Sequence, residues 1–190
     1  MATVTPMAVE STAIDGLVVI TMKQVEDERG VVREFYRASS WAEAGLPTLG
    51  PWQQMNVTES KRGALRGLHG EDMFKLVAVA AGEAFGAYVD TRAGSATFGA
   101  VATVRLEVGR QVLVPKGVGN GFQSLTDSQY LYSFDAEWMP GMAGTAVNPL
   151  DPALAIAWPL AVDVDDPARI SAKDRDQPTF VQAVSGNDAR

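Results

Sequence analysis

Apolar residues along the middle of the chain fall into short stretches that are separated by glycines and polar turns. The clearest stretch lies at residues 101–108, where Val104, Leu106 and Val108 share one face. The residues between them are charged or carry a hydroxyl group. Successive side chains of a β-strand point to opposite faces, so this period of two predicts a strand with one buried face.

Similar apolar runs between turn residues predict further strands. The runs at residues 75–80 and 84–90 flank the short turn 81–83, and we expect them to pair as a hairpin. A turn is expected at residues 115–117, which are Pro-Lys-Gly. Many short strands with frequent turns favour an antiparallel sandwich or barrel over alternating strands and helices. The remaining strands are expected at residues 111–115, 121–124 and 130–134.

Helical patterns are scarce. Ser40 and Glu43 have the spacing of a capping box, so we expect a short helix that begins at Ser40 and ends at Gly45 and Pro47. A second short helix is expected after Pro178. Without internal repeats or low-complexity segments, the chain is predicted to be one mostly β domain over 1–190. Its parts would be N-terminal strands and an arm (about 1–50), a barrel core (about 51–160) and a C-terminal segment (161–190).

The composition is that of an ordinary globular protein, with 46% hydrophobic and 21% charged residues in a chain of 190. The net charge of −7 argues against nucleic-acid or anionic membrane partners, so a phosphate-bearing ligand would need a local basic pocket. The absence of cysteine excludes disulfides, thiol catalysis and cysteine-bound zinc. We find no signal peptide and no membrane-spanning run, and expect a cytoplasmic protein.

The chain contains a single histidine, His69, between Leu68 and Gly70. Histidine is the side chain whose ordinary titration falls in the physiological pH range, so any proton chemistry through an imidazole must occur here. Composition alone does not favour that role, because an isolated histidine is more often a structural residue. The sequence around it decides the question.

A series of short motifs between residues 25 and 178 resembles one known family when the motifs are taken together and in order. They are DERG (27–30) with Glu34, QMN (54–56), LRGLH (65–69), KLV (75–77), VDTR (89–92), SATFG (95–99), VPKG (114–117), GF (121–122), YLY (130–132), NPLDP (148–152) and SAKD (171–174). This set resembles the dTDP-4-dehydrorhamnose 3,5-epimerase family. The resemblance implies an all-β, antiparallel jelly roll of the cupin type with a few short helices at the termini.

The family epimerises 4-keto-6-deoxy nucleotide sugars without a metal or redox cofactor. A base removes a proton beside the ketone, and an acid on the other face of the ring returns one. The resemblance implies that His69 is the base, Asp174 the carboxylate that orients it, and Tyr132 the proton donor. Lys75 and Arg66 would face the keto sugar and the diphosphate. Taken singly, these side chains would pass for core or surface residues, and only their joint agreement supports the functional interpretation.

Further positions match residues that bind the substrate in the family. Arg29 and Glu34 would reach the site of a neighbouring subunit, so the resemblance implies a homodimer. Trp138 stands where the family usually has a tyrosine that stacks on the nucleotide base. The implied substrate-binding residues are Arg29, Glu34, Gln54, Asn56, Arg66, Asn120, Trp138 and Lys173.

Several positions depart from the family's pattern. Asn120 replaces a second histidine, Gly86 replaces an acid, Ala143 replaces a glutamate, and the segment at 70–74 is short. These departures concern the substrate and the number of inverted centres more than the reaction type, so epimerases acting only at C3 or C5, or on GDP- or CDP-linked sugars, remain alternatives. So do an isomerase that moves the keto group and a non-catalytic carbohydrate-binding jelly roll. Metal-binding cupins use two or three histidines, so with one histidine we expect no catalytic metal.

Overall fold

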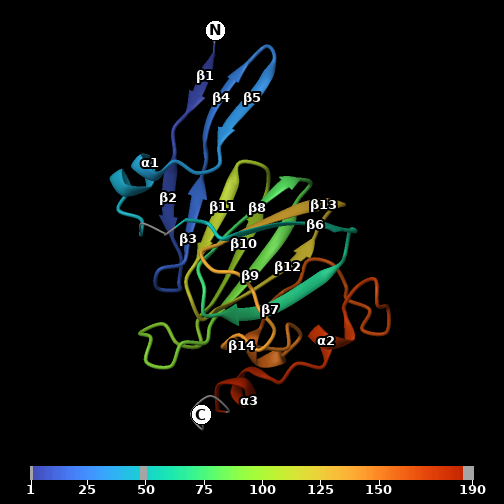
Figure 1. The fold of residues 1–190 in the computed structure, drawn as a ribbon. Coiled ribbons are helices and arrows are strands. Elements are labelled where there is room, and N and C mark those ends of the chain that lie inside the picture. Colours follow the sequence, from blue (N-terminus) through green and yellow to red (C-terminus); the bar gives the residue numbers. More distant parts are fainter. Residues whose placement is uncertain (1, 48–50, 186–190) are drawn as a thin grey trace.

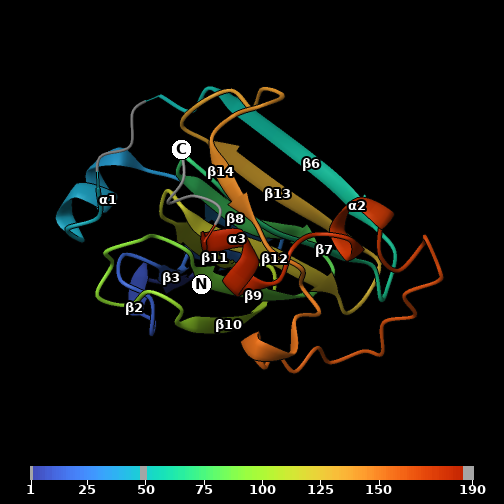
Figure 2. The ribbon, with the colours of Figure 1, turned by 90° about the horizontal axis from the view of Figure 1, so that it is seen from below.

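The computed structural model describes residues 2–47 and 51–185, and most of its strands form two antiparallel sheets that face each other as a jelly-roll barrel (Figure 1, Figure 2). One sheet has five strands in the order β10-β9-β12-β7-β14. These strands are β7 (Leu65–Glu71), β9 (Ala84–Asp90), β10 (Val101–Leu106), β12 (Val118–Ser124) and β14 (Gly144–Ala146).

The second sheet of the barrel has six strands in the order β2-β3-β11-β8-β13-β6. They are β2 (Ala8–Ser11), β3 (Val18–Thr21), β6 (Gln54–Ser60), β8 (Lys75–Ala81), β11 (Arg110–Val114) and β13 (Ser128–Phe134). The predicted all-β, antiparallel jelly roll is confirmed.

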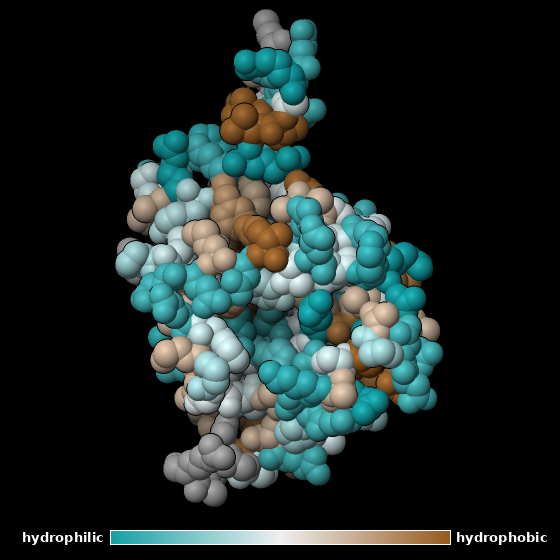
Figure 3. All heavy atoms as spheres, turned by 45° about the vertical axis from the view of Figure 1, so that its right-hand side comes forward, coloured by the Kyte–Doolittle hydropathy of each residue, from teal (hydrophilic) through white to brown (hydrophobic). Residues whose placement is uncertain are grey.

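A separate three-stranded sheet projects from the barrel near the N-terminus (Figure 1). It contains β1 (Thr3–Thr5), β4 (Lys23–Asp27) and β5 (Gly30–Glu34). Val4 and Val32 of this sheet are exposed, and Figure 3 shows a hydrophobic patch on the projection. The predicted boundary between the N-terminal arm and the barrel falls at residues 48–50, outside the described residues.

The helices are short and lie outside the barrel. They are α1 (Ala38–Glu43), the 3₁₀ helix η1 (Pro152–Leu154), α2 (Ala172–Arg175) and α3 (Phe180–Ser185). Helix α3 confirms the short helix that we expect after Pro178, whereas the sequence did not predict α2. None of the helices in 2–47 and 51–185 is long and apolar enough to cross a membrane.

The predicted hairpin between residues 75–80 and 84–90 is wrong, although both strands exist. Strand β8 pairs with β11 and β13, while β9 pairs with β10 and β12, so the turn carries the chain from one sheet to the other. Most residues of both strands are buried, since each lies inside its own sheet. A glycine turn between two apolar runs fits either connection, so the local sequence does not distinguish a hairpin from a crossing between sheets.

Two local expectations also need correction. Strand β10 ends at Leu106, and Val108 is 37% exposed in the following turn rather than buried with Val104 and Leu106. Helix α1 begins at Ala38 and has no side-chain cap, so the capping box is wrong. Burial of Trp41, which is 2% exposed, holds this helix against the six-stranded sheet.

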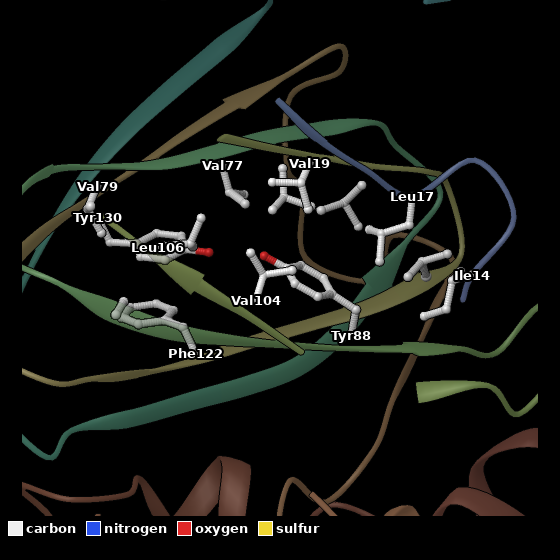
Figure 4. Packing of buried hydrophobic residues seen from close by; sticks show 14 residues of the cluster. Ile14, Leu17, Val19, Val77, Val79, Tyr88, Val104, Leu106, Phe122 and Tyr130 are labelled. Atoms are coloured by element: carbon white, nitrogen blue, oxygen red, sulfur yellow. The ribbon is translucent and has the colours of Figure 1, made fainter. Parts of the chain in front are cut away.

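Aromatic and branched side chains fill the interior between the two sheets (Figure 4). The rings of Phe122 on β12 and Tyr130 on β13 stack with centroids 3.8 Å apart and so join the two walls. Phe122 also lines a cavity at one side of this core. The core therefore forms the floor of that cavity.

Candidate active site

A cavity of about 230 Å³ lies between the two sheets and contains most of the expected site residues. The five-stranded sheet contributes residues of β7 and β12, and the six-stranded sheet contributes residues of β6, β8 and β13. The lining comprises Gln54, Asn56, Arg66, Gly67, His69, Glu71, Lys75, Asn120, Gly121, Phe122, Tyr132, Phe134 and Trp138.

A bulge in β7 places Arg66 and His69 at the same cavity. His69 lies opposite Asn120 and Arg66 lies opposite Phe122, so β7 has one residue more than β12 over this interval. Residues three apart in a regular strand face opposite sides of the sheet. The extra residue of a bulge shifts the alternation by one, so that Arg66 and His69 face the same side. Gly67 makes the bulge possible, because its φ is +117° and a Cβ there would overlap the Cα of Gly121.

His69 is paired with Asp174, as the resemblance implied. Its Nε2 lies 2.8 Å from Oδ1 of Asp174, and the two side chains are 31% and 10% exposed. Burial would raise the pKa of the Asp174 carboxyl, but hydrogen bonding with His69 and Ser171 holds that pKa below its usual value. The carboxylate therefore stays charged at neutral pH beside the imidazole.

The C-terminal segment folds back over β7 to bring Asp174 there. The backbone N–H of Leu65 donates to the carbonyl of Arg169 at 2.7 Å, and Leu65 forms a parallel bridge with Ile170. Ser171 then caps α2, since its Oγ accepts from the backbone N–H of Asp174 at 3.1 Å. These contacts fix the carboxylate next to the strand that carries His69.

Tyr132 lies on β13, in the sheet opposite to the one that carries His69. Its ring stacks on Phe134 with centroids 5.7 Å apart and contacts Tyr130 at 4.9 Å. Burial raises the pKa of the Tyr132 hydroxyl far above its usual value; Arg66 acts against this shift. Tyr132 is therefore protonated at neutral pH, and it occupies the opposite wall of the cavity from His69.

Lys75 and Glu71 form a buried ion pair at the same cavity. Lys75 is 4% exposed, and its Nζ donates to the carbonyl of His69 at 2.8 Å and to Oε2 of Glu71. Burial lowers the pKa of the Lys75 ammonium, and Glu71 opposes that shift. Glu71 was not predicted from the sequence, although it lies two residues after His69, where strand alternation places it on the same face.

Several implied binding residues lie at the mouth of the cavity. Gln54 accepts a hydrogen bond from the backbone N–H of Trp138 at 2.7 Å and donates to Asn56 at 3.3 Å. Trp138 is 47% exposed, so one face of its indole is available for stacking. Lys173 lines an adjacent hollow together with His69.

Arg29 and Glu34 are not at the cavity of their own chain. Both belong to the projecting sheet, where Arg29 pairs with Asp27 at 2.6 Å and Glu34 pairs with Lys23 at 3.2 Å. The side chain of Arg29 is 89% exposed. The structure of one chain therefore does not bring these two residues to the other implied site residues.

Two of the positions that depart from the family's pattern, Gly86 and Asn120, lie next to the buried Tyr88. Asn120 is 5% exposed, and its Oδ1 has no partner among the described residues. At Gly86, a Cβ would lie 2.6 Å from the hydroxyl of Tyr88, which therefore fills the space that a side chain at Gly86 would need. The hydroxyls of Tyr88 and Tyr130 point toward each other inside the barrel (Figure 4), and neither has another partner within the described part of the chain.

The described residues contain no group of three or more histidine, cysteine or acidic side chains that could hold a metal ion. What the cavity offers is an imidazole paired with a carboxylate on one wall, a protonated tyrosine on the other, and a buried lysine in the same lining. Such a site can move protons on both faces of a bound ligand. The fold and the site thus define a jelly-roll protein equipped for acid–base chemistry.

Known proteins identify the family. The family model for dTDP-4-dehydrorhamnose 3,5-epimerase matches residues 11–182. A dTDP-4-dehydrorhamnose 3-epimerase of Streptomyces niveus is 34% identical over 195 residues, covering 94% of this chain and 93% of the relative. The dTDP-4-dehydrorhamnose 3,5-epimerase of Salmonella typhimurium is 35% identical over 185 residues, covering 94% and 98%.

Solved structures agree with this assignment. NovW, a 4-keto-6-deoxy sugar epimerase of Streptomyces spheroides, superposes with a TM-score of 0.87 at 32% identity, over 96% of this chain and 92% of that one. RmlC of Legionella pneumophila, solved with dTDP-4-keto-L-rhamnose, gives a TM-score of 0.83 at 36% identity, over 93% and 94%. The chain belongs to the dTDP-4-dehydrorhamnose 3,5-epimerase family, a family of isomerases, and the resemblance read from its motifs is confirmed.

Proposed function

We propose that the protein epimerises a nucleotide-diphospho-4-keto-6-deoxyhexose at C3, C5 or both. The observation that carries this proposal is the placement of the His69–Asp174 pair and Tyr132 on opposite walls of one cavity. A base and an acid on opposite faces of a sugar ring are what inversion by proton transfer requires. A non-catalytic binding module has no need of all three groups.

In the proposed reaction, His69 takes the proton from the carbon beside the ketone. Its Nε2 is bonded to Asp174, which leaves the other ring nitrogen for the substrate. The Asp174 carboxylate stabilises the imidazolium that forms, as the acid of a catalytic triad does. The electron pair of the broken C–H bond moves to the keto oxygen and gives an enolate.

Lys75 and Tyr132 complete the sequence. The Lys75 ammonium stabilises the enolate oxygen, and this effect is strong because the group is buried. Tyr132 then gives its proton to the same carbon from the opposite face, which inverts the centre. Solvent restores the proton of the tyrosine and removes the one on His69, so each inverted carbon carries a hydrogen from water.

We further propose that the protein acts as a homodimer in which Arg29 and Glu34 reach the partner's cavity. Around the cavity of one chain, Arg66 and Lys75 are balanced by Glu71 and the Asp174 next to His69, which leaves Lys173 in the adjacent hollow as the remaining lysine or arginine for a diphosphate.

The projecting sheet supplies the groups that this dimer needs. The side chain of Arg29 is 89% exposed there although it pairs with Asp27, and the apolar residues Val4 and Val32 of the same sheet are 57% and 71% exposed. A second copy would cover this apolar face and bring a further cation.

Mixed dimers test whether Arg29 of one subunit completes the cavity of the other. When His69→Ala and Arg29→Ala chains are combined, one site of each mixed dimer regains a base from one chain and an arginine from the other. We expect activity above that of either variant alone. Activity that does not exceed the sum of the two separate variants would contradict the shared site.

Proton exchange with solvent tests the reaction itself. We expect deuterium at C3, C5 or both when dTDP-, GDP- or CDP-linked 4-keto-6-deoxy sugars are incubated with the protein in deuterated water and read by NMR. His69→Ala should abolish exchange, whereas Tyr132→Phe should retain part of the exchange and lose inversion. The labelled positions distinguish an epimerase acting at one centre from one acting at two. No exchange at either carbon with any of these sugars would refute the proposal.

The single-domain organisation, the cytoplasmic location and the independence from a metal or redox cofactor stay predictions from the sequence. Fractionation of the native protein, and activity after dialysis against a chelator, are the measurements that check the last two.

A further inference from the structure

Glu71 is a buried carboxylate whose place in the reaction the family resemblance does not assign. It lies on β7 two residues after His69, lines the same cavity and pairs with Lys75. Its side chain is 21% exposed and that of Lys75 is 5% exposed. We propose that Glu71 is a positioning residue that keeps Lys75 protonated and directed at the keto oxygen of the substrate. This inference rests on the proposed epimerase function.

The contacts of Lys75 define its direction. An ammonium has three N–H donors. One donates to the carbonyl of His69 at 2.8 Å and one to Glu71, so the third is left for the cavity that Lys75 lines. Both acceptors belong to β7, the strand that also carries the proposed base. Lys75 is thus held in a fixed place relative to the carbon that loses its proton.

The short connection between β7 and β8 makes this pair possible. Only Asp72, Met73 and Phe74 separate Glu71 at the end of β7 from Lys75 at the start of β8. Met73 is fully buried, and the backbone N–H of Phe74 donates to Oδ1 of Asp135 at 2.8 Å, so the turn is anchored at both positions. The segment that departs in length from the family's pattern is therefore the one that brings the carboxylate to the lysine.

The charges around Lys75 leave Glu71 as its acidic partner. The other charged or titratable groups at the cavity are Arg66 and His69 on β7, Tyr132 on β13 and Asp174 on α2; Lys173 on α2 lines the adjacent hollow together with Glu71. Asp174 is bonded to His69, and Tyr132 remains neutral. Of the acids in the described residues, Glu71 alone forms an ion pair with Lys75. Because burial disfavours an ammonium, Lys75 would lose its proton more readily without that partner.

Three substitutions of Glu71 separate charge from packing. Glu71→Gln keeps an oxygen acceptor for Lys75 but removes the charge, Glu71→Asp keeps the charge, and Glu71→Ala removes both. Asp72→Asn is the matched control, because Asp72 is the neighbouring acid and its side chain is 71% exposed.

The pH profile of kcat is the first measurement. For Glu71→Gln we expect the alkaline limb to move down by about one to three pH units, the size of effect that one close opposite charge has on a pKa. Below that limb kcat should stay within about threefold of the unmodified enzyme. Glu71→Asp should restore the limb at least in part, Glu71→Ala should lower kcat at all pH values, and Asp72→Asn should change neither.

Direct titration of Lys75 is the second measurement and needs no substrate. The protein has five lysines, so NMR of lysine labelled with ¹³C at Cε gives a small set of signals, and Lys75→Met assigns the one in question. We expect Lys75 to titrate at a lower pH in Glu71→Gln than in the unmodified protein. A folded Glu71→Gln protein in which either the Lys75 titration or the alkaline limb is unchanged overturns the inference. If the unmodified protein exchanges no proton with any keto sugar, the proposed function fails, while the titration still decides whether Glu71 controls the charge of Lys75.

Discussion

Replacing Asp174 by Asn removes the charge beside His69 while keeping the shape of the side chain. The two groups are 2.8 Å apart and partly shielded from water, since their side chains are 31% and 10% exposed. Two unit charges about 4 Å apart interact by ~1 kcal/mol in bulk water and ~4 kcal/mol near a protein surface. We take about 2–4 kcal/mol for this half-buried pair, which corresponds to a loss of about 30- to 1,000-fold in the rate of proton removal.

The rate of deuterium incorporation from solvent measures this loss directly. It should be followed by NMR with a saturating concentration of the keto sugar that shows exchange, so that a change in substrate binding does not enter. Asp176→Asn is the control, because Asp176 lies two residues away on the same segment and bonds Arg175 at the surface. Its rate should stay within about twofold. The circular dichroism spectrum and Tm of both variants establish that they are folded.

Two results would refute this reasoning. An Asp174→Asn enzyme that exchanges protons within threefold of the unmodified rate would show that the carboxylate does not support the base. An equal loss in Asp176→Asn would show that the effect comes from disturbing α2 rather than from the charge. His69→Ala provides the reference for complete loss of the base.

Three further predictions concern the buried polar groups. Tyr88→Phe should change the free energy of unfolding by no more than about 1 kcal/mol, because the lost hydroxyl faces only the Tyr130 hydroxyl in the barrel, and calorimetry should show a Tm within about 2–4 °C of that of the unmodified protein. Gly86→Asp should lower the free energy of unfolding by at least about 2 kcal/mol, because its Cβ would lie 2.6 Å from the Tyr88 hydroxyl. The same substitution in a Tyr88→Ala background should cost much less. Equal losses in the two backgrounds, measured by urea unfolding, would contradict this. The pKa of Asp90 is lowered by Arg92, Ser95 and Thr97 against the effect of burial, so this carboxylate stabilises the fold above its ordinary pKa and loses that contribution as the pH falls. Asp90→Asn should therefore lower the free energy of unfolding by about 2–3 kcal/mol at neutral pH. This is less than the ~3–5 kcal/mol for breaking a fully buried pair, because the side chain of Arg92 is 27% exposed. In a plot of stability against pH, the fall at acid pH should be flatter for this variant.

Local patterns predicted the strands well but not how they pair. Alternation at residues 101–108 found β10, and apolar runs found β8 and β9. The pairing of β8 and β9 was misjudged because a short glycine turn can close a hairpin or pass between sheets. That choice depends on what each strand buries on its second face, which is a property of the whole barrel.

Local sequence patterns also fail to predict which residues meet at the site. Strand periodicity places Arg66 and His69 on opposite faces, and only the bulge at Gly67 brings both to the cavity. The contact between His69 and Asp174 joins positions 105 residues apart, which no local pattern contains. Both residues were expected at the site only through the family resemblance. Glu71 was within reach of simple alternation from His69, but no familiar motif drew attention to it.

Two of the departures from the family's pattern, Asn120 and Gly86, lie next to the same side chain, Tyr88. Asn120 lies directly opposite His69 on one neighbouring strand and opposite Tyr88 on the other, so the three side chains form one row across the sheet. An asparagine replaces the second histidine in this row, and the Tyr88 hydroxyl fills the space left by Gly86.

The row therefore contains one proton carrier. An amide does not titrate near neutral pH, and burial keeps the Tyr88 hydroxyl protonated. Glu71 is the other acid–base group on this wall in the described residues, and it is bonded to Lys75. A proton removed on this side of the substrate must then pass through His69. The loss expected for Asp174→Asn should consequently appear in full, with no second base to mask it.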